Sequence, residues 1–166
     1  MKIVVISDSH DNVANLEKVL KWANKNNIEA LIHAGDLSAP GVLKNTLASG
    51  FTKDIYIING NVSDPELLAK VSLDFPNVKY LGGEGEAEID GRKIYITHFP
   101  PRAKAIAGAG VYDLVVFGHS HKSESSQVGK TMLLNPGTLG GLYNQPTFAT
   151  YETKNGEAEI FELNNI

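Results

Sequence analysis

The chain has 166 residues, of which 42% are hydrophobic and 20% charged, and this length suits one domain over residues 1–166. The formal net charge of −4 excludes a broad basic surface for binding nucleic acid. It has no cysteine, which excludes thiolate metal sites, cysteine nucleophiles and disulfide bonds. No apolar run reaches the roughly 18 residues of a membrane span, and the short run after Lys2 lacks a signal cleavage site, so we expect a cytoplasmic protein.

The first half of the chain alternates between buried strands and amphipathic helices. Continuous apolar runs predict strands at residues 2–7, 30–34, 55–59 and 77–81. Helical spacing predicts helices at residues 13–25, with Asn12 as N-cap, and at residues 41–49. Ser63-Asp64-Pro65-Glu66 predicts the start of another helix, with Asp64 as N-cap and Pro65 as the first helical residue. Strand and helix in alternation are typical of parallel β-α-β units.

The second half is richer in hairpins. Turn signals predict strand pairs at residues 86–89 and 92–97, joined by Asp90-Gly91, at 125–128 and 131–135, and at 148–153 and 157–163. A short helix is expected at residues 102–109 and a buried strand at 114–117. We expect the hairpins to meet in an antiparallel second sheet, so that the whole is an α/β (α+β sandwich) fold with helices outside two sheets, in the order αββα.

Polar motifs follow the apolar runs at the points where the strands end. They are Asp8-Ser9-His10, Gly35-Asp36, Gly60-Asn61, His98 and Gly118-His119-Ser120-His121. Ligands of α/β sheets collect at the carboxyl ends of strands, so these side chains are expected to converge although they lie far apart in the sequence.

The chemistry of these side chains points to metal ions. Two carboxylates, one amide and four imidazoles are too many ligands for one closed four-coordinate ion. Asp8 and His10 are expected to face one ion, because residues i and i+2 of an extended segment point the same way, and the carboxylate of Asp36 can bridge two ions. Two metals about 3.5–4 Å apart are the usual clamp for displacement at phosphorus, with a hydroxide between them as the nucleophile.

The order D-x-H, G-D, G-N, H, G-H-x-H resembles the calcineurin-like metallophosphoesterase family. With the chain length and the Asn135-Pro136-Gly137-Thr138 segment, it resembles the small YfcE-type phosphodiesterase subgroup, over essentially the whole chain. The resemblance implies a four-layer αββα fold with two mixed β-sheets flanked by helices. It also implies a metal-dependent phosphodiesterase that acts through a hydroxide bridging two metals.

The resemblance also implies roles for the residues that match its motifs. The first metal would be held by Asp8, His10, Asp36 and His121, and the second by Asp36, Asn61, His98 and His119, with Asp36 as the bridge. Asp36, Asn61 and His98 are the residues expected to matter most for catalysis. Mn²⁺ is the first choice of metal, with Ni²⁺, Fe²⁺ or Zn²⁺ as alternatives, because mixed nitrogen and oxygen ligands suit all of them.

Two departures from the family pattern concern the substrate. Larger members carry a histidine after the metal-binding asparagine, where this chain has Val62. A valine can neither stabilise the transition state nor protonate the leaving group, so we expect a preference for phosphodiesters with good leaving groups. Phe99-Pro100-Pro101 follows His98 and is expected to form a stiff apolar wall beside the site, against which an aryl or nucleoside group could stack.

Several alternatives stay open. His33 is interpreted as a hydrogen-bonded histidine within its strand, with support of a metal ligand as the alternative. Arg102 and Lys104 are surface charges or contacts for substrate phosphate, and Asn135-Pro136-Gly137 is a tight turn under the site. The competing functions are a scaffold like the retromer subunit of this fold, a phosphomonoesterase and a nuclease. The expected partner is a small phosphodiester, with no stable nucleic-acid complex and no membrane, and a homodimer stays open.

Overall fold

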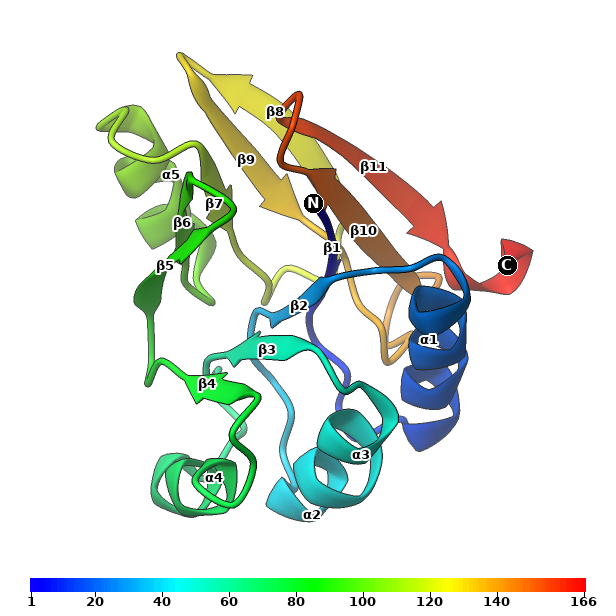
Figure 1. Cartoon of the computed structure of the whole chain (residues 1–166). Helices are drawn as coiled ribbons and strands as arrows, with labels where there is room; N and C mark the ends of the chain where they lie inside the picture. Colours follow the sequence, from blue (N-terminus) through cyan, green and yellow to red (C-terminus); the bar gives the residue numbers. More distant parts are fainter.

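The computed structural model describes residues 1–166, whose strands form two sheets (Figure 1). The six-stranded sheet has the order β11-β10-β1-β2-β3-β4, and the five-stranded sheet has the order β5-β6-β7-β9-β8. The strands are β1 Lys2–Ile6, β2 Ala30–His33, β3 Asp54–Ile57, β4 Val78–Tyr80, β5 Gly85–Ile89, β6 Arg92–Ile96, β7 Leu114–Val116, β8 Glu124–Val128, β9 Thr131–Asn135, β10 Thr147–Glu152 and β11 Glu157–Glu162.

Helices occur where the sequence predicts them, although the one expected at residues 102–109 begins at Pro100 and the one expected at residues 41–49 contains a π-helical turn. They are α1 Val13–Lys25, α2 Pro40–Val42, α3 Ala48–Gly50, α4 Pro65–Ser72 and α5 Pro100–Gly108; a π-helical turn, Leu43–Leu47, joins α2 to α3, and a 3₁₀ turn, Leu163–Asn165, ends the chain. The Asn12 side chain accepts a hydrogen bond from the Asn15 N–H, and Asp64 accepts one from the Leu67 N–H. Both expected N-caps are confirmed, and each supplies an acceptor for a backbone donor that has no partner inside the helix. None of the helices is long and apolar enough to cross a membrane.

Both sheets are mixed, as the resemblance implies. Strands β1 to β4 are parallel, and β10 pairs antiparallel with β1. In the second sheet β6, β7 and β9 are parallel, with β5 and β8 added antiparallel at the edges. The antiparallel second sheet expected from the hairpins is therefore wrong, because β7 lies between β6 and β9 and pairs parallel with both.

Three apolar cores separate four layers. One core lies between the first sheet and helices α1 to α4, and includes Leu16 and Ile57. A second lies between the two sheets, where Ile32 of the first sheet meets Ile96 of the second, and a third lies under α5 around Phe117. Figure 1 shows α1 to α4 around the first sheet and α5 beside β6 and β7. The predicted αββα order is therefore confirmed.

The expected place of the last hairpin is also wrong, because β10 and β11 do not join the second sheet. Strand β10 pairs with β1 in the first sheet, with Lys2 opposite Glu152. The reason is that β10 is buried on both faces, because Phe148 packs in the helix-side core while Ala149 and Tyr151 pack between the sheets. Only a position inside the first sheet gives this strand an apolar cover on each side.

Candidate metal centre

The polar motifs come together at the carboxyl ends of parallel strands from both sheets. Asp8 and His10 follow β1, Asp36 follows β2 and Asn61 follows β3 in the first sheet. His98 follows β6, and His119 and His121 follow β7 in the second sheet. The site is thus assembled across the sheet-to-sheet boundary.

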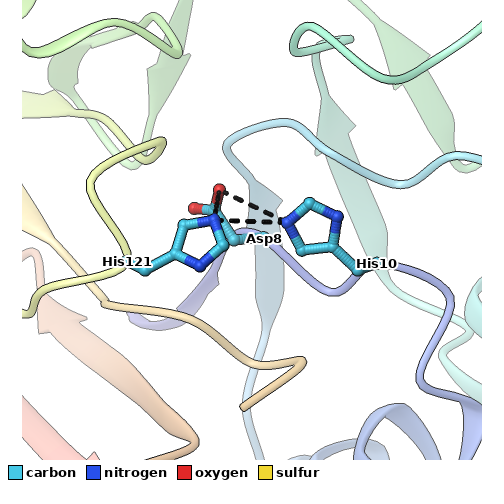
Figure 2. Close-up of side chains that lie close together, drawn as sticks. All are labelled: Asp8, His10 and His121. Carbon is cyan, nitrogen blue, oxygen red and sulfur yellow. Dashed lines mark hydrogen bonds and ion pairs between the residues drawn. The ribbon is translucent and has the colours of Figure 1, made fainter. Parts of the chain in front are cut away.

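Asp8, His10 and His121 form the first group of side chains that could hold a metal ion (Figure 2). The Nε2 atom of His121 lies 3.2 Å from Oδ1 of Asp8 and 3.3 Å from Nε2 of His10. In Figure 2 the two imidazoles come from different loops and turn toward the carboxylate between them. Two imidazole nitrogens and a carboxylate oxygen at this spacing are a ligand set for a divalent ion such as Mn²⁺ or Zn²⁺.

Asp8, Asp36 and His98 form the second group. Nε2 of His98 lies 3.4 Å from Oδ2 of Asp36 and 4.0 Å from Oδ1 of Asp8. The same Oδ2 of Asp36 is 3.8 Å from Nε2 of His10, in the first group. Both carboxylates therefore face both groups, Asp8 as well as the predicted bridge Asp36.

Asn61 and His119 lie beside the second group. Nδ1 of His119 is 2.9 Å from Oδ1 of Asn61, and the ring of His119 is 5.2 Å from that of His98 between centroids. The structure thus brings all seven predicted ligands to one edge of the two sheets.

The backbone is left-handed rather than extended at five of the seven predicted ligands. The φ angles are 51° at Asp8, 43° at His10, 61° at Asp36, 68° at His119 and 57° at His121. The expectation that Asp8 and His10 share a direction because their segment is extended is therefore wrong. Their side chains meet because the chain turns sharply at both residues, a conformation that Asp and His adopt more readily than β-branched residues do.

The backbone fixes the two carboxylates before any ion binds. Oδ1 of Asp36 accepts hydrogen bonds from the N–H groups of Asn61 (2.8 Å) and Val62 (3.2 Å), and Oδ2 of Asp8 accepts one from the N–H of His119 (3.0 Å). A Cβ at Gly60 would collide with the Asp36 carboxylate, and one at Gly118 with Ser7 and Asp8. Glycine is needed at both positions so that the loops approach these carboxylates closely.

The carboxylate of Asp36 stays ionised in this setting. Burial acts to raise its pKa, but His98 and the N–H groups of Val62 and Asn61 outweigh burial and lower the pKa to about 2. Asp36 therefore presents negative charge over the whole physiological pH range.

The hydrogen bonding of the buried His98 shows whether the site suits a bound cation. Its side chain is fully buried, and its Nδ1–H donates to the Ala34 carbonyl at 2.8 Å, while Nε2 has no hydrogen-bond partner. In the neutral ring, the lone pair on Nε2 then faces carboxylate oxygens, an arrangement that needs a proton or a cation between them. Burial acts to lower the pKa of His98, but Asp36 and the Ala34 carbonyl raise it above its ordinary value. A divalent cation would satisfy this nitrogen and both carboxylates.

His33 is hydrogen-bonded within the fold, as expected. Its Nε2 lies 2.9 Å from Oγ of Ser9, and Ser9 also reaches the backbone oxygen of Asp36 at 3.4 Å. Burial lowers the pKa of His33 to about 3, so the ring is neutral near pH 7. Ser9, in the loop after β1, is thus joined to the last residue of β2 and to the loop that follows β2.

Asn135 supports the site as well as forming the tight turn that the sequence suggests. It is fully buried, and its Nδ2 donates to the Gly118 carbonyl (3.1 Å) and to Oγ of Ser120 (3.0 Å), while its Oδ1 accepts from the Gly137 N–H (2.9 Å). It therefore holds the loop that carries His119 and His121. The available signal was its place at the end of β9, which is parallel to β7 and ends at the same sheet edge.

The alternative role of Arg102 in holding substrate phosphate gains no support. Its guanidinium makes paired hydrogen bonds to Glu84, the shortest 2.9 Å, and one to the Tyr95 hydroxyl at 3.3 Å. The guanidinium is thus engaged by a carboxylate on the surface.

The chain is similar to known phosphoesterases over nearly its whole length. The family model described as the calcineurin-like phosphoesterase superfamily domain matches residues 1–156. The chain is 30% identical over 161 residues to Phosphodiesterase MJ0936 of Methanocaldococcus jannaschii, covering 95% of this chain and 96% of that protein.

Two solved structures share the fold. One, described as a novel archaeal phosphodiesterase, superposes with a TM-score of 0.84 at 27% identity and covers 97% of this chain and 99% of its own. The other is Vps29 of Entamoeba histolytica complexed with Zn²⁺, with a TM-score of 0.69, 20% identity, and coverage of 98% of this chain and 99% of its own.

Proposed function

Because the chain belongs to the calcineurin-like phosphoesterase superfamily, whose members use divalent metals to hydrolyse phosphoric esters, we propose that it is a metal-dependent phosphodiesterase. The relative with 30% identity is named a phosphodiesterase, and each chain covers at least 95% of the other. The small phosphodiester expected as substrate needs no nucleic-acid surface, in keeping with the net charge of −4.

The observation that carries the proposal is the unpartnered Nε2 of His98, aimed at two buried carboxylates. We assign the first metal to Asp8, His10, Asp36 and His121, and the second to Asp36, Asn61, His98 and His119. The carboxylate of Asp8, which this assignment gives to the first ion, also lies 4.0 Å from Nε2 of His98, so Asp8 is a further candidate ligand of the second ion.

Bound divalent ions would supply Lewis-acid polarisation of the phosphoryl oxygens and a water of lowered pKa. The chain's own contribution is to keep the ligands in the right protonation states. The Nδ1–H groups of His98 and His121 donate to the carbonyls of Ala34 and Leu142, which leaves each Nε2 free as a ligand. The histidines are thus ligands in this proposal and not general bases. Mn²⁺ is our first choice of metal.

The leaving-group side of the site offers no acid at the position of Val62. The Val62 N–H donates to Asp36, and its side chain is 42% exposed at the mouth of the site. A leaving group that departs there must be stable without protonation, so we propose that diesters of acidic alcohols and phenols are turned over fastest.

Metal analysis combined with a substrate panel tests this proposal. The protein is stripped with EDTA, reloaded with Mn²⁺, and assayed on p-nitrophenyl diesters, p-nitrophenyl phosphate and cyclic nucleotides. We expect two ions per chain, turnover that EDTA abolishes and Mn²⁺ restores, and diesters ahead of the monoester. Faster turnover of the monoester would replace the proposal by a phosphomonoesterase, and the absence of both metal and turnover would favour a scaffold.

Variants of one ligand from each group sharpen the assignment. His121→Ala and Asn61→Ala each remove a ligand that we assign to one ion only, so each is expected to lower the metal content toward one ion per chain. An unchanged stoichiometry of two in either variant would contradict the assignment of that residue.

A further inference from the structure

Exposed apolar side chains border the candidate metal centre. Four of the large hydrophobic residues that remain exposed are placed next to its loops: Val62, Phe99, Leu142 and Tyr143, with exposed fractions of 42%, 45%, 45% and 94%. Val62 and Phe99 directly follow the predicted ligands Asn61 and His98, and the Leu142 carbonyl accepts from His121. Apolar surface gathered at the mouth of a polar site is typical of a surface that binds a ligand.

Phe99 lies at the end of the centre that holds the second group. Its ring centroid is 5.3 Å from that of His98 and 5.1 Å from that of His119, with interplanar angles of 79° and 64°. The residue is the N-cap of α5 and precedes Pro100 and Pro101, so its backbone has little freedom. One ring edge is thus held by the histidines while nearly half of the side chain stays open to solvent.

Tyr143 lies at the other end, beside the first group. Its ring centroid is 5.6 Å from that of His121, and its backbone is left-handed with φ of 65°. The loop that carries it is tied to the site, because the Gly140 N–H donates to the Asp8 carbonyl and the Leu142 carbonyl accepts from Nδ1 of His121. An aromatic ring that is 94% exposed gains almost nothing from folding, yet this loop places it at the site.

We propose that Phe99 and Tyr143 are two aromatic subsites, one at each end of the metal centre, which stack on the planar aromatic ester groups of the phosphodiester substrate. The inference rests on the proposed function, in which ions held by both groups of ligands would polarise the phosphoryl oxygens, so that phosphorus would lie between the two rings. The two ester groups of a diester leave phosphorus in different directions, so each can lie beside one ring. Aromatic rings recognise flat groups through stacking, without hydrogen bonds to a particular edge.

The neighbouring charges support stacking over polar recognition of these ester groups. The carboxylate of Asp11 is already used within the fold, since it accepts hydrogen bonds from the N–H groups of Ser38 and Ala39. Arg102 is paired with Glu84, and Val62 is apolar. Aromatic esters also suit a site that has no acid for the leaving group, because phenolates and related groups depart without a proton.

Three substrates with one leaving group test the proposal. Methyl p-nitrophenyl phosphate, bis(p-nitrophenyl) phosphate and the p-nitrophenyl ester of thymidine 5′-phosphate all release p-nitrophenolate, but their second ester group is a methyl, an aryl ring or a nucleoside. The Phe99→Ala/Tyr143→Ala double variant is expected to lose about tenfold in kcat/KM on the aryl or nucleoside diester beyond any loss on the methyl ester, the size typical of one lost stacking partner. Loss on the aryl diester alone identifies an aryl substrate, and loss on the nucleoside diester identifies a nucleobase.

Matched variants separate stacking from other effects. Tyr143→Phe keeps the ring without the hydroxyl and is expected to keep the wild-type preference, which a role of the hydroxyl as an acid would not allow. Leu73→Ala removes a side chain that is 87% exposed on the far end of α4 and is expected to change none of the three rates. Equal changes for all three substrates in the double variant, or no change in any, would overturn the proposal.

A binding measurement keeps this test apart from the test of the proposed function. Phenylphosphonate and methylphosphonate are titrated calorimetrically into the Mn²⁺-loaded wild type and double variant. We expect the wild type to bind phenylphosphonate about tenfold more tightly than methylphosphonate and the double variant to bind both alike. A preference that persists in the double variant overturns the aromatic subsites, whereas a wild type that binds metal but hydrolyses none of the diesters overturns the proposed function.

Discussion

The two sheets contribute different parts of the candidate metal centre. Loops of the first sheet carry both carboxylates, and these are almost completely buried, with Asp8 at 0% and Asp36 at 2% exposure. The loop after β7 of the second sheet carries His119 and His121, of which His119 is exposed. The charged oxygens are thus set deep in the first sheet, and the imidazoles of this loop close over them from the second.

The two contributions depend on one another. The N–H of His119 donates to Asp8, and Asn135 of the second sheet holds the loop from which it does so. Backbone N–H groups thus fix the negative charge, whereas the loop of His119 and His121 is held by the buried amide of Asn135 together with hydrogen bonds to Asp8 and to the Leu142 carbonyl.

The largest effect is expected from Asp36→Asn on the first-sheet side. The variant removes the charge of a carboxylate that faces both groups, so turnover of bis(p-nitrophenyl) phosphate should fall by more than about 100-fold, since losses in the outer shell alone cost about 10- to 100-fold. Metal content should fall as well, measured by atomic emission. Asp64→Asn makes the same chemical change at a helix N-cap and should leave both unchanged. Full metal content and turnover in Asp36→Asn would show that it is no bridge.

On the second-sheet side, Asn135→Ala should lower turnover and Mn²⁺ affinity by about 10- to 100-fold, because the loop of His119 and His121 loses its buried support. The control is Asn77→Ala, which likewise removes a side-chain amide with two hydrogen bonds. The Asn77 amide donates to the carbonyls of Phe51 and Lys53, far from the site. Both variants should lose stability in urea, yet only Asn135→Ala should lose metal affinity. Equal metal affinity in the two variants would argue against a positioning role for Asn135.

The buried ring of His33 makes the stability of the folded chain depend on pH, and this dependence can be measured without metal. The folded chain keeps this ring neutral down to about pH 3, whereas the unfolded chain takes up a proton near its ordinary pKa of 6.5. The unfolded state then binds more protons, so stability falls as the pH falls through this window, by about 2 kcal/mol between pH 7 and pH 5.

Urea unfolding in EDTA at both pH values measures this loss. His33→Asn serves as the reference, because His98, whose pKa is raised, contributes with the opposite sign in both proteins. The difference between wild type and variant should shrink as the pH falls, and a difference independent of pH would contradict the neutral His33.

The smallest effect is expected outside both sides of the centre. Arg102→Ala removes an exposed guanidinium that is engaged by Glu84, so kcat and KM for the diester should stay within about twofold of the wild type. A tenfold rise in KM alone would restore the alternative in which Arg102 contacts substrate phosphate.

The sequence predicts most of the elements because their signals are local. Apolar runs, the caps Asn12 and Asp64, and the Asp90-Gly91 turn each act within a few residues, and the structure has each where it is expected. The expected place of the β10–β11 hairpin was wrong, because a hairpin signal identifies two strands that pair but not the third strand that lies beside them. That choice depends on β1, about 150 residues away in the chain.

The convergence of the candidate ligands was predictable for a similar reason. Parallel strands end at one edge of a sheet, so a polar residue after each run is enough to place it. The left-handed backbone of Asp8 and His10 was not predictable, because neither residue is glycine and the preceding strand suggests an extended chain. Tyr143 carried no signal at all, since its loop holds no motif and only the folded structure places it beside His121.

The left-handed backbone of the candidate ligands lowers the stability of the folded chain. Each non-glycine residue in this conformation costs on the order of 1 kcal/mol, and five of them are candidate metal ligands. A chain selected only as a rigid platform would gain stability by placing glycine at the three histidines among them, whereas the two carboxylates also accept backbone hydrogen bonds. This chain instead keeps histidine at those three positions, so without bound ions it is less stable than its own architecture permits.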